Sequence, residues 1–232
     1  MNARDIAAWN GSSWTALLAG TSGGPVDSVS CLTVHVGELI AAGEFFSMGG
    51  VIAHNIARWN GFFWQPLGTG MSSWVSGLAS INGELFAGGD FNTAGGIPAS
   101  KTARWNGSNW SALSDVVFPV TMMGVHNNQV YTATTTGSLG QFYILNGSNW
   151  NSVSSVVQRA ECMTTFQGGL VLGGMFNTLG GTVTANNIAR RIGTTWHAFG
   201  AEDVTMVRSM LPFGPRLLVG GTFNQESSNG LP

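Results

Sequence analysis

The chain has 232 residues, of which 44% are hydrophobic and 9% are charged. This apolar content is sufficient to bury a sizeable core, which argues against intrinsic disorder. The net charge of −2 without any basic run excludes the electrostatic surface of a nucleic-acid-binding protein, and no stretch reaches the roughly 18 apolar residues of a membrane-spanning helix. Residues 1–5 lack the apolar core of a secretory signal peptide, so we expect either an intracellular protein or a leader outside this sequence.

A nine-residue phrase, Ile-Ala-Arg-Trp-Asn-Gly-x-x-Trp, recurs along the chain with some variation. Its copies occupy Ile6–Trp14, Ile56–Trp64, Thr102–Trp110, Phe142–Trp150 and Ile188–Trp196. The final tryptophans of the copies are 50, 46, 40 and 46 residues apart. A repeat of this length, rich in glycine and β-forming residues, is typical of the blade of a β-propeller.

The second repeat shows the expected strands of one blade most clearly. Val75–Ile81 alternates apolar and small residues and predicts an inner strand. The dipeptide Asn82-Gly83 predicts a tight hairpin into a second strand, Glu84–Phe91. The remaining segments are a loop, a third strand and an outer strand, at 92–100, at Thr102–Trp105 and around Trp110. Each blade is therefore expected to contain four antiparallel strands.

Each second strand ends in a signature of two small residues, a variable residue and phenylalanine. Its copies are Ala42–Phe45, Gly88–Phe91, Gly173–Phe176, Gly220–Phe223 and a degenerate Ala133–Thr136. The degenerate blade has also replaced its Trp-Asn pair with Leu145-Asn146. We interpret it as the divergent member of the set.

The two ends of the chain complement each other. The sequence opens at a third strand, Asp5–Trp9, and stops at Gly230–Pro232, which aligns with Gly96–Pro98 just before a third strand. We therefore predict a single all-β domain over residues 1–232, a closed five-bladed propeller with a composite blade from 1–20 and 201–232. In that blade Asp5–Trp9 should pair with Leu217–Phe223, which would remove the exposed sheet edges.

The double glycine at the end of a second strand, followed by tryptophans in strands three and four, resembles a kelch-type blade. The whole phrase with its upstream Gly-Gly-x-Phe is also similar to repeats of bacterial secreted or surface proteins and of the fungal cortical cell-polarity marker family. The resemblance covers essentially the entire chain. It implies an adhesive or interaction module without a shared active site. In blade count alone, the expected ring is similar to the tachylectin lectins and to arabinanase-type glycosidases.

Positions that stay constant between blades are expected to serve packing. Trp9, Trp59 and Trp105 recur at one position, which favours contacts between blades over sugar stacking. Two acid–base pairs, Glu44 with Arg58 and Asp90 with Arg104, are each fourteen residues apart and are expected to form cross-strand ion pairs. Cys31 and Cys162 also share one position, in blades far apart around the ring, so we expect small buried thiols without a disulfide.

One position, at the start of the inner strand, carries a different residue in every blade: Ser28, Trp74, Pro119, Arg159 and Met206. In a propeller this position lies at the mouth of the central channel. Trp74 and Arg159 there would stack on and hydrogen-bond a ligand, and Ser28 and Met206 complete the predicted ligand-binding set. We expect Trp74 to be partly exposed and near Arg159 or its neighbouring loops. The alternative is ordinary drift of loop residues.

Signals for catalysis are weak. The four histidines, His35, His54, His126 and His197, fall at positions that do not match between blades and lack metal-ligand spacing, so we predict no metal and no cofactor. A glycosidase would need two carboxylates facing each other across the channel. The acids nearest the channel loops are Asp27, Asp115, Glu161 and Asp203, whereas Glu38 and Glu84 are assigned to hairpin turns.

We interpret the chain as a non-enzymatic binding module whose partner is a glycan or a protein surface. Its lysine-poor composition, with Lys101 as the single lysine, favours an extracellular, cell-surface or virion-exposed location. Two alternatives stay open: a glycoside-active enzyme that uses channel carboxylates, and a structural repeat module without a ligand. The sequence does not specify the ligand or the oligomeric state. It also leaves open whether the five repeats are natural or result from trimming or engineering of an array.

Overall fold

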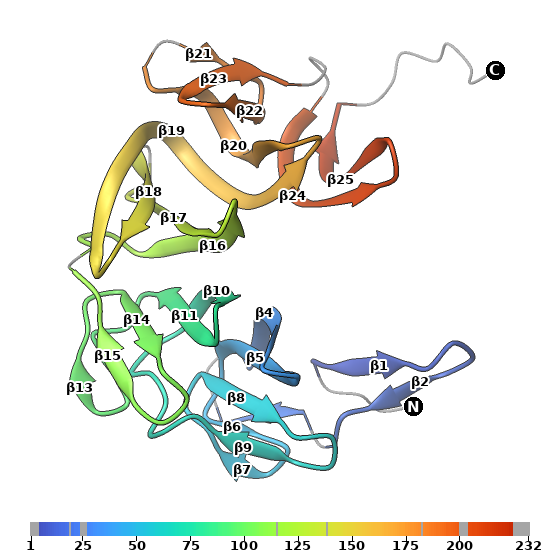
Figure 1. Cartoon of the computed structure of the whole chain (residues 1–232). Coiled ribbons are helices and arrows are strands. Elements are labelled where there is room, and N and C mark those ends of the chain that lie inside the picture. Colours follow the sequence, from blue (N-terminus) through green and yellow to red (C-terminus); the bar gives the residue numbers. More distant parts are fainter. Residues whose placement is uncertain are drawn as a thin grey trace.

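The computed structural model describes residues 5–18, 20–23, 27–114, 116–137, 139–181, 183–199 and 204–224. Within these ranges the chain is all β-structure, without a helix. The strands form antiparallel sheets that follow one another along an arc in chain order (Figure 1).

The first two complete blades have the predicted four-stranded order. Their strands are β4 (Ser28–His35), β5 (Glu38–Glu44), β8 (Ile56–Trp59) and β9 (Trp64–Pro66), then β10 (Val75–Ile81), β11 (Glu84–Gly89), β14 (Thr102–Trp105) and β15 (Trp110–Ala112). Asn82 and Gly83, between β10 and β11, both have positive φ, which is the conformation that a type I′ hairpin turn requires. The Asn-Gly signal therefore predicted this hairpin correctly.

The next two blades are joined into one eight-stranded sheet. It contains β16 (Val120–His126), β17 (Gln129–Thr135), β18 (Leu139–Asn146), β19 (Asn149–Phe166), β20 (Gly169–Leu179), β21 (Val183–Thr184), β22 (Ile188–Ile192) and β23 (Thr195–Ala198). The single strand β19 is the outer strand of one blade and the inner strand of the next (Figure 1). Its sequence has no glycine or proline to end the strand, whereas the link from β9 to β10 contains Gly68 and Gly70.

The loop expected between second and third strands contains a small hairpin in three blades. These hairpins are β6 (Ser47–Met48) with β7 (Val51–Ile52), β12 (Thr93–Ala94) with β13 (Ile97–Pro98), and the end of β20 with β21. The linker before each blade pairs with its hairpin: β3 (Thr21–Ser22) with β6, Met71 with Ala94, and Val156 with Leu179. In the divergent blade the described residues between β17 and β18 form no such hairpin, which agrees with its shorter repeat of 40 residues.

The predicted pairing of Asp5–Trp9 with Leu217–Phe223 is not formed. Among the described residues, β1 (Ala7–Trp9) pairs only with β2 (Trp14–Ala16), and β25 (Arg216–Phe223) pairs only with β24 (Val204–Phe213). Figure 1 shows the two hairpins lying apart. Each is held by a different neighbour: the indole Nε1 of Trp64 donates to Leu17 O at 3.0 Å, whereas Val207 packs with Phe166, Val171 and Ile188. Neither hairpin therefore depends on the other for its position.

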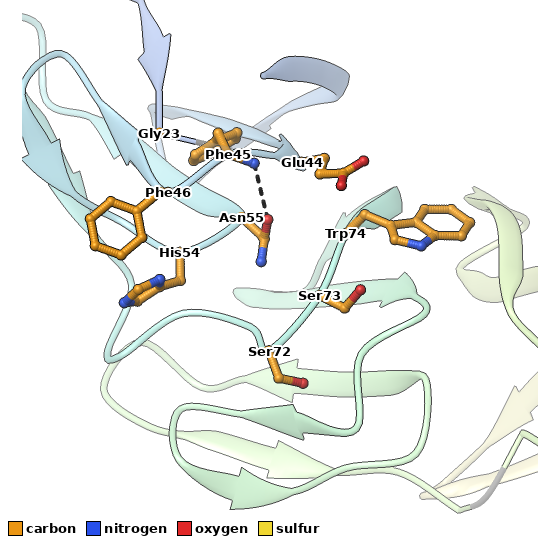
Figure 2. A pocket seen from close by; sticks show the side chains of 9 residues that line it. All are labelled: Gly23, Glu44, Phe45, Phe46, His54, Asn55, Ser72, Ser73 and Trp74. Carbon is orange, nitrogen blue, oxygen red and sulfur yellow. Dashed lines mark hydrogen bonds between the residues drawn. The ribbon is translucent and has the colours of Figure 1, made fainter. Parts of the chain in front are cut away.

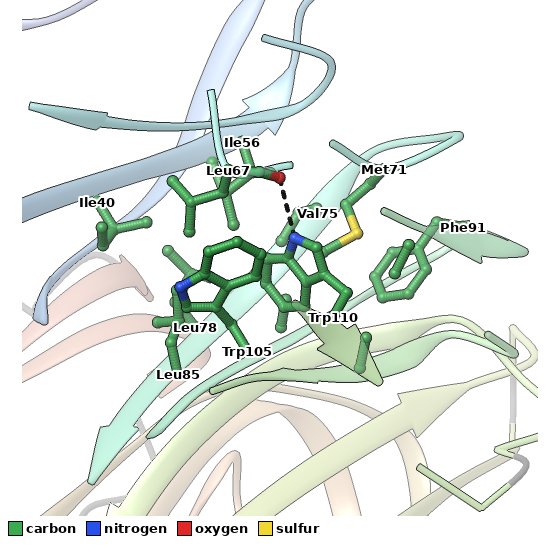
Figure 3. Close-up of a cluster of buried hydrophobic side chains, with 14 of the residues drawn as sticks. Ile40, Ile56, Leu67, Met71, Val75, Leu78, Leu85, Phe91, Trp105 and Trp110 are labelled. Carbon is green, nitrogen blue, oxygen red and sulfur yellow. Dashed lines mark hydrogen bonds between the residues drawn. The ribbon is translucent and has the colours of Figure 1, made fainter. Parts of the chain in front are cut away.

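Neighbouring blades are held together by buried aromatic and aliphatic side chains. Between the first two blades, Trp105 and Trp110 pack with their ring centroids 5.3 Å apart against Ile40, Ile56 and Leu67 (Figure 3). Trp110 Nε1 donates to Leu67 O at 3.0 Å, as Trp64 does one blade earlier. Each fully buried aliphatic side chain contributes about 1.5–3 kcal/mol. Of the three tryptophans predicted to serve packing, Trp105 is buried and Trp59 is half-buried in such contacts, whereas Trp9 is 52% exposed.

The double glycine lets backbones approach closely. A Cβ added at Gly43, Gly89, Gly174 or Gly221 would overlap the carbonyl oxygen of the residue that starts the inner strand, Ser28, Trp74, Arg159 or Met206. The preceding glycines, Gly88 and Gly173, face Val120 and Val207 of the next blade, with an added Cβ 2.7 and 2.5 Å from Cγ1. The signature therefore fixes the strand-start position against its own second strand.

The arginines form other pairs than predicted. Arg58 Nη1 lies 3.4 Å from Glu38 Oε2, and Arg104 Nη1 lies 3.4 Å from Glu84 Oε1. Because Arg58 is opposite Ile40, Glu38 is two residues away on the same sheet face, whereas Glu44 is four residues away along the strand. The expected Glu44–Arg58 and Asp90–Arg104 pairs are therefore wrong; Asp90 instead pairs with Lys101, Oδ1 to Nζ 2.8 Å.

Candidate functional site

The strand-start residues occupy one equivalent position in each blade. Each lies opposite the residue that follows the double glycine: Ser28 opposite Glu44, Arg159 opposite Met175 and Met206 opposite Thr222. The Trp74 carbonyl accepts the amide of Asp90 at 3.0 Å. All four candidate side chains are half-buried. Partial exposure of Trp74 agrees with the sequence analysis.

Trp74 borders a pocket of about 240 Å³ between the first two complete blades. We call it the Trp74 pocket, and its lining residues are Gly23, Glu44, Phe45, Phe46, His54, Asn55, Ser72, Ser73 and Trp74. Figure 2 shows the Trp74 indole and the Glu44 carboxylate extending toward the same side, while Phe46 and His54 lie at the opposite end. The Phe46 and His54 rings pack edge to face with centroids 4.8 Å apart. The pocket therefore combines aromatic faces with one carboxylate.

Asn55 holds the framework of this pocket. Its Oδ1 accepts the amide of Phe45 at 3.0 Å, and its Nδ2 donates to Met71 O at 2.9 Å (Figure 2). The residue has φ 63, a left-handed conformation that asparagine adopts more readily than most residues. We call this arrangement, which ties the second strand of one blade to the linker before the next, the asparagine clamp.

The serines supply hydrogen-bonding capacity. Ser72 Oγ accepts the backbone amides of Asn92 and Thr93, both at 3.0 Å, so its hydroxyl hydrogen is left to donate to a ligand. A second pocket of about 260 Å³ shares His54, Asn55 and Ser72 with the first and reaches Thr69 and Gly96. The two pockets form one groove along the junction of the two blades.

The structure does not gather the four predicted ligand residues into one site. Neither Ser28, Arg159 nor Met206 lines the Trp74 pocket. Arg159 Nε lies 3.0 Å from Glu161 Oε1, so its charge is already paired within β19. Trp74 and Arg159 belong to blades that are not adjacent in the chain, and Arg159 does not line the Trp74 pocket, so their expected proximity remains a prediction.

The pocket residues Phe46, His54, Asn55 and Ser72 escaped the sequence analysis. These residues lie in the loop between the second and third strands and in the linker between blades. The repeats predicted a ligand position only at the residue that starts the inner strand. One signal was present in the repeats: the residue before the third strand is Asp5, Asn55, Lys101 and Asn187 in four units. All four have φ between 63 and 68.

Two histidines occupy equivalent positions, contrary to the sequence analysis. His35 and His126 each end an inner strand, opposite Glu38 and Gln129. His35 Nδ1 lies 3.0 Å from Ser80 Oγ, and His126 Nδ1 lies 2.8 Å from Thr165 Oγ1, both on the next blade. Burial lowers the pKa of both imidazoles; Glu38 partly offsets this for His35, and Arg191 adds to it for His126. These side chains link inner strands.

Among the described residues, neither Glu44 nor Glu161 faces a second carboxylate in a pair suited to glycoside hydrolysis. The Trp74 pocket holds one carboxylate, Glu44, and Glu161 is paired with Arg159. Asp115 and Asp203 lie outside the described residues, and Asp27 is engaged in an interaction of its own. Within the described ranges, no group of three histidine, cysteine or acidic side chains is arranged to hold a metal ion.

The two cysteines are free thiols in β4 and β19. Burial raises the pKa of Cys31 to about 12, and burial together with the nearby Glu161 raises the pKa of Cys162 to about 12. Both thiols are therefore protonated and poorly nucleophilic near neutral pH.

Comparison with known proteins gives matches in structure only. Neither a protein-family model nor a curated protein sequence matches the chain. The extracellular domain of a putative hybrid two-component system from B. thetaiotaomicron aligns with a TM-score of 0.59 and 13% identity, over 92% of this chain and 28% of that one. YCF48 bound to D1 peptide aligns with a TM-score of 0.53 and 15% identity, over 95% of this chain and 71% of that one.

The fold is β-propeller-like. This statement rests on the successive antiparallel sheets and on both structural alignments, and at such identities the likeness concerns the fold alone. The chain spans less than a third of the length of the two-component-system domain. A search of the described residues finds no helix long and apolar enough to cross a membrane.

Proposed function

We propose that the chain is a non-enzymatic binding module that takes up a carbohydrate in the Trp74 pocket. The observation that carries the proposal is the combination in one groove of a half-buried indole, a carboxylate and a serine hydroxyl free to donate. Sugar rings present an apolar C–H face that packs on an aromatic ring, and hydroxyl groups that pair with carboxylate and hydroxyl oxygens. Trp74 and Glu44 provide these two kinds of surface on one side of the pocket.

A binding role is favoured over catalysis by the carboxylate count. Glycoside hydrolysis uses two carboxyl groups about 5–10 Å apart, whereas the Trp74 pocket contributes one. The candidate Glu161 is paired with Arg159 on another blade. We therefore assign Glu44 to ligand orientation and not to acid–base chemistry.

We further propose that the module is a kelch-like, five-bladed ring whose fifth blade consists of β24, β25, β1 and β2. An extracellular, cell-surface or virion-exposed location is consistent with the single lysine of the chain. One structurally similar protein is an extracellular domain. Such a setting would expose the groove to glycans on a neighbouring surface.

An array of neutral and acidic glycans tests this function, with the wild-type chain compared with Trp74→Ala. We expect retention of at least one glycan by the wild type and a loss of about 1–3 kcal/mol in binding free energy on Trp74→Ala, the scale of a modest hot spot. Phe62→Ala, which removes an exposed aromatic ring outside the groove, serves as the control. Binding that is unchanged in Trp74→Ala, or an array without any bound glycan, contradicts the proposal; in the latter case a protein surface becomes the candidate partner.

A further inference from the structure

We propose a second carbohydrate site between β20–β22 and β24, the structural counterpart of the Trp74 pocket, with a ligand that is neutral. We call it the Asn186 pocket. It has a volume of about 380 Å³ and is lined by Gln158, Met175, Asn177, Asn186, Asn187 and the start of β24. The inference extends the proposed function to a second, chemically different site.

The framework of the two pockets is the same. Asn187 Oδ1 accepts the amide of Phe176 at 2.9 Å, and its Nδ2 donates to Val204 O at 2.5 Å. These bonds repeat those of Asn55 to Phe45 and Met71, and the two clamp residues have φ 67 and 63. The asparagine clamp therefore builds the same kind of hollow at both junctions.

The side chains that project into the hollow differ. Counting from the clamp and from the second strand, Asn186 replaces His54, Asn177 replaces Phe46, and Met175 replaces Glu44. Val204 and Thr205 line the Asn186 pocket on the side where Ser72 and Ser73 line the Trp74 pocket. The described part of the Asn186 pocket is thus lined by carboxamides, a hydroxyl and apolar groups, and none of these described lining residues is ionisable.

The carboxamides are available to a ligand. Asn177 and Asn186 are exposed, and within the described part of the chain their side chains make no hydrogen bond. A carboxamide both donates and accepts, which matches the hydroxyl groups of an uncharged sugar, since each hydroxyl also does both. Met175 and Val204 provide the apolar contact for the C–H face of the ring. A charged ligand would find no counter-charge among the described residues of this lining.

The junction between the second and third complete blades is built differently from the two junctions that carry an asparagine clamp. There Lys101 stands at the clamp position, and its Nζ lies 2.8 Å from Asp90 Oδ1 and 3.1 Å from Asn92 Oδ1. Asp90 and Asn92, the residues equivalent to Glu44 and Phe46, are therefore both engaged by Lys101. At the Asn186 pocket the equivalent groups are left unpaired.

Native mass spectrometry of the full chain with chitotetraose, cellotetraose and β-1,4-galactotetraose tests the proposal by counting bound molecules. We compare the wild type with Trp74→Ala, with the double variant Asn177→Ala/Asn186→Ala, and with all three changes combined. Asn151→Ala, an exposed carboxamide on β19 outside both pockets, is the matched control. Thermal melting of each variant establishes that it is folded.

We expect two molecules of one tetrasaccharide on the wild type and on Asn151→Ala, one on Trp74→Ala, one on the double variant and none on the combined variant. Affinity at the altered pocket should fall about tenfold or more. A single bound molecule that is lost on Trp74→Ala and retained by the double variant overturns the second site while the proposed function stands. Absence of binding by all three tetrasaccharides overturns the second site directly, and the broader glycan array then decides the function of the Trp74 pocket.

Discussion

Two buried imidazoles, His35 and His126, link each inner strand to the next blade at equivalent positions. The two imidazoles are 6% and 8% exposed, and they hydrogen-bond to the half-buried Ser80 and the exposed Thr165. Burial disfavours the charged imidazolium, and this is why the pKa of each is lowered. The folded state therefore binds fewer protons at these residues than the unfolded state just below pH 6.5.

This difference predicts a pH dependence of stability. Because the folded pKa is lowered, the contribution of the two histidines is fully present above pH 6.5, the usual value, and is lost as the pH falls below it. We expect the free energy of unfolding, measured with urea, to fall between about pH 7 and 5.5, above the range where most carboxylates titrate.

The double variant His35→Gln/His126→Gln keeps a hydrogen-bonding group at both positions and removes the titration. Its stability should change less over the same pH interval than that of the wild type. His197→Gln, an exposed histidine, is the control and should follow the wild type. A wild-type curve that is flat over this interval, or one that rises on acidification, would show that these imidazoles do not govern the effect.

At the scale of the strand, the double glycine decides how the inner and second strands fit together. Replacing Gly89 with alanine places a Cβ on the carbonyl oxygen of Trp74. This oxygen belongs to the backbone, so it cannot move aside as the end of a flexible side chain would. We expect Gly89→Ala to lower the free energy of unfolding by about 2 kcal/mol or more, as overpacking of a tight backbone contact does. The measurement is urea unfolding monitored by tryptophan fluorescence.

The divergent blade offers the matched control. Thr134 is opposite Val120, as Gly89 is opposite Val75, so this blade already accommodates a side chain there. Thr134→Ala only removes atoms at this position and creates no overlap, so we expect it to lower the free energy of unfolding by less than Gly89→Ala does. Equal destabilisation by Gly89→Ala and Thr134→Ala would mean that the glycine serves some purpose other than close approach.

Strand order and turn positions could be predicted from the sequence because each depends on local chemistry. The alternation in Val75–Ile81 and the dipeptide Asn82-Gly83 specify a strand and a hairpin without reference to the rest of the chain. Partners across strands were harder. The constant spacing of fourteen residues suggested that Arg58 pairs with Glu44. The register of β5 and β8 instead places Glu38 beside Arg58.

The candidate site was predicted in part, through Trp74. Its remaining groups come from the asparagine clamp and from the linker between blades, whose positions follow from the pairing of a linker with a small hairpin. The pairing of linker and hairpin produces no periodic pattern of apolar residues by which it could be found in the sequence. Likewise, the fusion of two blades through β19 results from missing turn residues, which a search for repeats does not register.

At the scale of the whole molecule, the two terminal hairpins carry the marks of an incomplete blade. Trp14 is 58% exposed, whereas its counterparts Trp64 and Trp110 are 1% and 6% exposed. Phe223, the counterpart of the fully buried Phe45, is also exposed. The two hairpins thus present apolar surface and unpaired strand edges that pairing would remove.

Asp5 adds a conformational argument for closure. It has φ 64, the conformation of the clamp residues Asn55 and Asn187, and its carboxylate accepts the hydroxyl of Thr21. At Asn55 and Asn187 the side chain at this position accepts the amide of the phenylalanine that follows the second strand. In a closed ring the carboxylate of Asp5 could accept the amide of Phe223 in the same way.

The central claim, a five-bladed ring with a composite blade, is tested most directly by a disulfide across the expected pairing. Transfer of the Ala41–Ala57 register to the terminal hairpins brings Val219 opposite Ala7. We predict that the double variant Ala7→Cys/Val219→Cys forms an internal disulfide in the monomer under mild oxidation, seen by intact mass and non-reducing electrophoresis. The native thiols, with a pKa of about 12, should not compete. The register-shifted control Ala8→Cys/Val219→Cys should stay reduced, because its thiols point to opposite faces of the sheet. Thiols that remain free in Ala7→Cys/Val219→Cys, or that link only separate chains, would contradict a closed ring.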